Sequence, residues 1–139
     1  MKKLLLLLLL APTFIQAEEF NLVCEGETFT FDDYGNKSNY SETIGIKVRE
    51  ENIKIKKYTY STWRNDLIES SYIKDEDSIS VAQTSRMGSC SYINYMVDIN
   101  RVTGLIETIW RQTDSCKEGE LIMQANFEGK CKKQKGNAF

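Results

Sequence analysis

Apolar and polar residues alternate with a period of two in several separate segments, and this pattern restricts the fold more than any other feature. The clearest case is residues 93–99, and the same alternation covers residues 43–49, 53–56, 78–82 and 121–128. Such alternation places apolar side chains on one face of a strand, as in antiparallel sheets with one buried face. Helical periodicity is lacking after the first 17 residues, so the sequence predicts an all-β protein.

Segments rich in Gly, Asp and Asn separate the alternating runs and predict turns. They occupy residues 33–36, 50–52, 64–66, 74–77, 85–89 and 117–119. Their short, regular spacing predicts eight or nine short antiparallel strands, with sequence neighbours adjacent in a meander. The chain of 139 residues, 41% of them hydrophobic, is the size of one domain. We therefore expect a single β domain over residues 18–139, closed into a small barrel or a sandwich.

Four cysteines follow the N-terminal apolar segment, namely Cys24, Cys90, Cys116 and Cys131. An even number in an exported chain predicts two disulfides. A zinc site normally uses closely spaced pairs such as C-x-x-C. Even the nearest two cysteines here are far apart, so we expect no metal site.

The residues between Cys90 and Cys116 are centred on a predicted hairpin turn at residues 101–104. This segment suits a type I turn followed by Gly104 in the left-handed region, which forms a three-residue hairpin loop with a bulge. Facing residues on antiparallel strands lie close enough for a disulfide after modest adjustment. The predicted register pairs Arg101 with Leu105, Val97 with Ile109, Met96 with Trp110 and Cys90 with Cys116.

The remaining cysteines then predict a second disulfide, Cys24–Cys131. Period-two alternation places Cys24 on the face of Phe20 and Leu22, and it places Cys131 on the face of Phe127. Both thiols would point to the core, where a bond between the first and last strands would close a barrel or pin a sandwich. Four cysteines allow three connectivities, and the hairpin geometry favours this one.

The N-terminus reads MKKLLLLLLLAPTFIQA, which has the pattern of a secretory signal peptide. Two lysines precede an apolar run, and Ala17 occupies the small-residue position before a cleavage site. The run is too short to serve as a membrane anchor. We expect cleavage after Ala17, a bacterial periplasmic or secreted location, and no transmembrane segment in the mature chain. Loss of Lys2 and Lys3 leaves a chain more acidic than the formal −2, which argues against a nucleic-acid partner.

The sequence offers little for catalysis. It contains no histidine, the commonest general base and metal ligand near neutral pH. Phosphate-binding and nucleophile motifs are also missing. Paired carboxylates occur at Asp32–Asp33 and at residues 75–77, but Asp is common in turns. We expect a non-enzymatic protein without a cofactor, and we keep a His-free carboxylate hydrolase as an alternative.

The best binding candidate is the aromatic and basic segment at residues 56–64. If residues 53–60 form one strand, Tyr58 and Tyr60 share a face with Lys56, opposite Ile53 and Ile55. Aromatic side chains flanked by cations suit sugars, phosphates or a protein partner. Outer-face tyrosines are also ordinary in strands. The candidate binding residues are Lys56, Tyr58, Tyr60, Trp63 and Arg64.

Two short motifs, Ile99-Asn100-Arg101-Val102-Thr103-Gly104 and Gly129-Lys130-Cys131, resemble a loose family of small exported bacterial proteins. That family combines an N-terminal strand cysteine, an I-x-R-x-T-G hairpin and a C-terminal G-x-C. The resemblance covers about the second half of the chain together with Cys24. It implies export and a β-rich fold, but it implies no activity.

We therefore expect an exported binding or envelope accessory protein whose partner is a protein or a glycan at the cell envelope. The main alternative is a small-ligand carrier with its site in the mouth of a β-barrel. A carrier requires an unfilled apolar cavity, and a hydrolase requires two acidic groups in one cleft.

Overall fold

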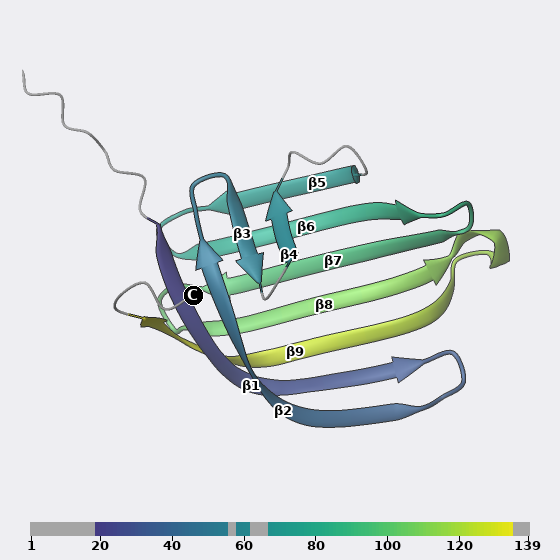
Figure 1. Cartoon of the computed structure of the whole chain (residues 1–139), viewed down its shortest axis with the longest axis horizontal. Helices are drawn as coiled ribbons and strands as arrows, with labels where there is room; N and C mark the ends of the chain where they lie inside the picture. Colours follow the sequence, from purple (N-terminus) through teal and green to yellow (C-terminus); the bar gives the residue numbers. More distant parts are fainter. Residues whose placement is uncertain (1–18, 56–57, 62–66, 135–139) are drawn as a thin grey trace, which may run out of the picture.

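The computed structural model describes residues 19–55, 58–61 and 67–134, with the backbone alone described at 58–61 and 67–68. This part of the chain folds into one sheet of nine antiparallel strands (Figure 1). The strands are β1 (Phe20–Asp32), β2 (Lys37–Val48), β3 (Asn52–Ile55), β4 (Tyr58–Ser61), β5 (Leu67–Lys74), β6 (Ser78–Met87), β7 (Ser91–Asn100), β8 (Leu105–Asp114) and β9 (Glu120–Gln134). One 3-10 turn, η1 (Ser115–Lys117), follows β8. The predicted all-β fold is confirmed.

The sheet is built from two meanders joined by the first and last strands. Its order is β4-β3-β2-β1-β9-β8-β7-β6-β5, so β1–β4 form one meander and β5–β9 form the other. The predicted turns at 33–36, 50–52, 74–77 and 117–119 connect strands as expected, while the turn at 64–66 lies outside the described residues. No helix of the described chain is long and apolar enough to cross a membrane.

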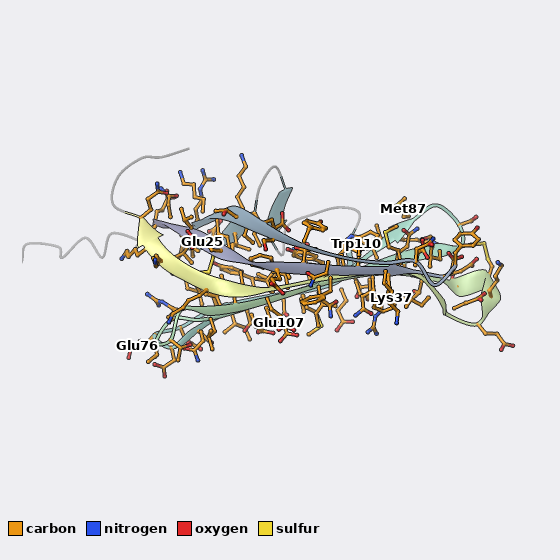
Figure 2. All side chains as sticks on the ribbon, turned by 90° about the horizontal axis from the view of Figure 1, so that it is seen from below. Glu25, Lys37, Glu76, Met87, Glu107 and Trp110 are labelled. Carbon is orange, nitrogen blue, oxygen red and sulfur yellow. A yellow bond between two sulfur atoms is a disulfide. The ribbon has the colours of Figure 1, made fainter. Side chains whose placement is uncertain are left out.

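One half of the sheet is rolled and the other half is open. Figure 1 shows β3 and β4 crossing over the strands of the second meander, and Figure 2 shows two layers at that end merging into a single layer at the other. We call the two-layered end the rolled half. We call the single-layered end the open half (Figure 2).

The rolled half contains the hydrophobic core. Ile46, Val48, Ile53, Ile79 and Val97 are fully buried there. Trp110 packs against this cluster from the edge of the open half. Alternate residues of β1, β2, β3, β6, β7, β8 and β9 supply the core, as the period-two pattern predicts, and the face bearing Ile53 and Ile55 is buried.

Side chains rather than a backbone ladder close the rolled half. The Tyr72 hydroxyl of β5 donates to the carbonyl oxygen of Arg49 at 2.6 Å. Lys74 of β5 lies 2.9 Å from Glu50 in the turn between β2 and β3. In the part of the chain described here, no ladder joins β4 to β5. The architecture is therefore a nearly closed barrel.

Both predicted disulfides are confirmed, but Cys24–Cys131 does not join the edges of the sheet. Cys24 and Cys131 face each other directly in the ladder between β1 and β9, at the centre of the strand order. This bond therefore joins the two meanders.

Gly26 and Gly129 form an adjacent facing pair that lets β1 and β9 approach closely. A Cβ on Gly26 would lie 2.1 Å from the carbonyl oxygen of Glu128, and one on Gly129 would lie 2.6 Å from that of Glu25. Neither position can accept a side chain without backbone movement, as is typical where glycine marks a bend or a close approach in a strand. The pair lies where the rolled half passes into the open half.

The predicted register of the 91–114 hairpin is wrong by one residue. Asn100 begins the turn, because its side-chain oxygen accepts the backbone N–H groups of Val102 and Thr103 at 3.0 and 2.8 Å. The connection therefore spans residues 101–104, and Ile99 faces Ile106. Gly104 has the expected positive φ of 74°, but it ends a four-residue loop instead of a three-residue one.

Cys90 and Cys116 pair despite the shifted register because both lie outside the ladder, which ends at Ser91 and Asp114. The chain turns into η1 after β8, and the side chain of Asp114 accepts the N–H of Cys116 at 2.9 Å. The N–H of Ser115 donates to the carbonyl of Cys90 at 2.7 Å. Together these bonds bring the two Cα atoms to 5.2 Å.

Candidate functional site

The structure tests only the backbone part of the predicted aromatic and basic site. Lys56, Trp63 and Arg64 lie outside the described residues, as do the side chains of Tyr58 and Tyr60. Residues 53–60 are not one strand, because β3 ends at Ile55 and β4 begins at Tyr58. The register sets Tyr58 opposite Ile55 and Tyr60 opposite Ile53, and it sets Thr59 opposite Lys54. The tyrosines were grouped with Lys54 and Lys56 on the assumption of one continuous strand, and the structure has two strands there.

A different surface emerges on the outer face of the sheet, which is the face opposite the core. Residues that face one another across successive strands form rows that cross this face. The apolar row runs Met96, Ile109, Asn126, Phe29 on β7, β8, β9 and β1. The acidic row, two residues along each strand, runs Asp98, Glu107, Glu128, Glu27. Figure 2 shows Glu107 and Lys37 on this face and Trp110 on the opposite one.

The apolar row exists because of the actual hairpin register. The predicted register paired Val97 with Ile109, which would have turned Ile109 toward the core. In the structure Ile109 faces Met96 instead, since a shift of one residue moves a strand's side chains to the other face. The sequence did contain a signal: Met96 is apolar at a position where the alternation of β7 calls for a polar residue.

Two hollows lie along the apolar row. The first has a volume of about 350 Å³, and its lining includes Met96, Ile109 and Ala82. The second has a volume of about 370 Å³ and is lined by Phe29, Phe31 and neighbouring polar residues. Met96 is 45% exposed and Phe29 is 41% exposed. Both hollows fall in the size range of small-molecule and side-chain binding pockets.

Between the hollows, a short polar network links β8 to β9 and reaches the row at Asn126. The Nε of Arg111 donates to the Oε1 of Gln124 at 2.9 Å. The Nε2 of Gln124 in turn donates to the Oδ1 of Asn126 at 2.9 Å. Gln124 is buried, so these bonds satisfy its amide and hold Asn126 in the middle of the row.

The acidic row places four carboxylates on four adjacent strands, each facing the next. All four side chains are exposed. Asp98 accepts a hydrogen bond from Ser80 at 2.6 Å, and no described lysine or arginine forms an ion pair with Glu27, Glu107 or Glu128. Like charges that face each other across strands are destabilising. A shallow depression of about 650 Å³ lies along this row, with Asp98, Glu107 and Glu128 in its lining together with the cation of Lys130.

The carboxylate pairs considered for catalysis serve as turn caps. Asp32 accepts the N–H groups of Tyr34 and Asn36 and the side-chain amide of Asn36. These bonds, chiefly the one from the Asn36 side chain, lower the pKa of Asp32. The N–H of Ser78, followed by that of Asp77, lowers the pKa of Asp75 in the same way. A general acid at neutral pH needs the opposite shift, so this geometry favours a structural role.

Among the residues that the structure describes, a small recess lies at the mouth of the barrel. It has a volume of about 170 Å³ and lies among Phe20, Leu22, Ile99 and Cys131. The cations of Arg101 and Lys133 lie 5.4 and 5.0 Å from the centre of the Phe20 ring. Ligand pockets usually enclose roughly 300–1,000 Å³, so this recess is small for a carrier site.

Among the described residues, the one group with metal-ligating atoms close together is Cys90, Asp114 and Cys116. Both sulfur atoms belong to a disulfide, and Asp114 caps η1. Since a metal needs the thiolate form of cysteine, these residues do not fit a metal site.

Comparisons with protein-family models, with curated proteins and with solved structures found no match for this chain. The resemblance to a loose family of small exported bacterial proteins therefore stays an expectation. The candidate site rests on its own geometry.

Proposed function

We propose that this protein is an exported, non-catalytic binding protein that uses the outer face of its sheet as the binding surface. The observation that carries the proposal is the apolar row. Met96 and Phe29 of this row stay exposed although the rolled half has already formed a buried core, and exposed apolar patches often mark interaction sites. An apolar row suits side chains of a protein partner at the cell envelope better than it suits a glycan.

Export is supported by two independent features. The N-terminal segment has the pattern of a signal peptide, and all four cysteines are paired. Disulfides persist mainly in oxidising compartments such as the periplasm. Mass spectrometry of the intact protein recovered from the exported fraction tests whether the chain is exported. We expect cleavage after Ala17 and loss of four hydrogens, and an uncleaved chain with free thiols would contradict export.

A binding role fits the chemistry of the described surface better than catalysis does. The chain has no histidine, and the carboxylates of Asp32 and Asp75 act as turn caps. The outer face combines apolar hollows with a line of charge, which is the combination a specific docking surface needs.

Site-specific photo-crosslinking in the host cell envelope tests the binding surface. A photoreactive phenylalanine analogue at position 96 should yield one discrete adduct, identified by mass spectrometry, and Ile109→Ser should abolish it. The matched control places the analogue at position 102, because Val102 is 75% exposed at the far tip of the 101–104 loop. An absence of adduct at position 96, or an identical adduct at position 102, would contradict the proposal.

A further inference from the structure

Ile109 and Phe29, each at the rim of one hollow, are spaced like the anchor residues of a helix. Ile109 and Phe29 are separated by two strand-to-strand steps, since β9 lies between β8 and β1. With neighbouring strands about 4.8 Å apart, this separation is roughly 9.6 Å. Residues i and i+7 of an α-helix lie roughly 10.5 Å apart on one face. Two apolar side chains of one helix can therefore pack on Ile109 and Phe29 together.

The acidic row sets the charge of the occupant. It lies two residues along the strands from the apolar row, which is roughly 6.8 Å. A lysine or arginine on the flank of a helix lying in the apolar row can span this distance. Four adjacent exposed carboxylates attract cations and disfavour anionic surfaces such as acidic lipids or nucleic acid.

These observations identify the kind of partner, on the basis of the binding function proposed above. We infer that the outer face binds a cationic amphipathic helix of another protein, which lies across β7, β8, β9 and β1. Apolar residues at i and i+7 pack on Ile109 and Phe29, and basic residues along one flank face the acidic row. Recognition by apolar anchors at helical spacing is a common mode of peptide binding. The occupied site would also neutralise the repulsion within the acidic row.

A synthetic peptide of about 14 residues, roughly four helical turns, tests this inference directly. It carries leucines at helical spacing on one face and lysines on the other. Titration into the processed full chain is followed by NMR of isotope-labelled methionine methyl groups. Met96 lies on the outer face, whereas Met87 and Met123 lie on the core-facing side of their strands. We expect the Met96 signal to shift and the other two to stay in place.

Charge variants sharpen the test. Glu107→Gln with Glu128→Gln should weaken peptide binding about fivefold to tenfold at low salt, as expected for the loss of two exposed charge pairs. The matched control is Glu76→Gln with Glu118→Gln, which changes the net charge equally at two exposed turn residues. The control pair should bind within about twofold of the parent, and the difference should shrink at about 0.5 M salt because the charges are screened.

Two further peptides test whether binding depends on positive charge and on the order of the residues. A peptide with the lysines replaced by glutamates, and one of scrambled order, should each bind at least about tenfold more weakly. Equal binding of the glutamate peptide, or shifts at Met87 and Met123 in place of Met96, would overturn the inference. If the crosslink at position 96 persists while the lysine peptide fails to bind, the binding surface stands and this partner class is wrong. If both experiments fail, the proposed function fails as well.

Discussion

The rolled half and the open half use the same strands in different ways. In the rolled half one face of each strand is buried against the opposite layer, and Cys24 is completely buried beside Cys131. In the open half both faces meet solvent, and Phe29, Tyr40, Met87 and Met123 are all exposed. The rolled half therefore supplies most of the stability, and the open half presents a surface that folding does not require. The chain can fold with such a surface exposed because the Cys24–Cys131 disulfide already joins the two meanders.

The largest expected difference between the halves concerns their disulfides. The Cys24–Cys131 bond spans 107 residues and Cys90–Cys116 spans 26. In the chain-entropy model these loops contribute about 5 and about 3.5 kcal/mol. Replacing Cys24 and Cys131 by alanine should therefore lower the free energy of unfolding more than replacing Cys90 and Cys116, and the buried pair also leaves a cavity. Urea unfolding of both double variants measures the two losses of free energy. A larger loss for the Cys90 and Cys116 variant would contradict the view that the rolled half supplies most of the stability.

The closure of the rolled half depends on Tyr72. Tyr72→Phe removes the hydroxyl that donates to the Arg49 carbonyl, so it should lower the free energy of unfolding by roughly 1 kcal/mol. Thermal or urea unfolding near neutral pH measures this loss. Tyr34→Phe is the control, because Tyr34 is 85% exposed and its replacement should have almost no effect. Equal losses in the two variants would mean that the Tyr72 hydrogen bond does not hold the barrel closed.

Alkaline pH provides a second test of the same contact. Burial of the hydroxyl, together with the negative charge of Glu50, raises the pKa of Tyr72 from 10.0 to about 12. The folded state thus holds this proton more tightly than the unfolded state, so the stabilisation is complete below pH 10 and falls between pH 10 and about 12. This part of the alkaline loss should disappear in Tyr72→Phe and persist in Tyr34→Phe. If the free energy of unfolding falls with pH in the same way in both variants, the alkaline loss does not come from Tyr72.

The smallest expected effect on stability concerns the acidic row on the outer face. Glu107 faces Asp98 on one side and Glu128 on the other, so Glu107→Gln should relieve repulsion and raise the Tm by about 1–3 °C at low salt. Glu76→Gln, in an exposed turn, is the control and should leave the Tm unchanged. A gain in stability together with weaker peptide binding would show that the row is kept for binding at the expense of stability. A lower Tm would mean that the row stabilises the sheet.

Local patterns were sufficient to predict most strands and most turns, and the disulfide pairing was right although the register used to pair Cys90 with Cys116 was wrong by one residue. The alternation at residues 93–99 and the turn residues at 33–36 and 74–77 act over a few neighbours, and the structure agrees with each. Cys24 and Cys131 could be paired because alternation placed both on the core side. These properties depend on side-chain period and on turn chemistry, which a short segment already contains.

The candidate surface could not be predicted in the same way, because it depends on register. Whether Asn100 or Arg101 closes the hairpin is a difference of one residue, decided by the side chain of Asn100 capping the turn. That difference moves Ile109 from the predicted core to the outer face. The break between Ile55 and Tyr58 likewise changed the neighbours of the predicted aromatic site.

The sequence by itself determined that this chain forms antiparallel strands with one apolar face and two disulfides. Tertiary structure decided that β1 pairs with β9, that the sheet rolls at one end only, and that the acidic and apolar rows lie side by side. The physical reason is that alternation specifies which residues share a face of one strand. Which residues become neighbours across strands depends on long-range pairing and on the packing that closes the barrel.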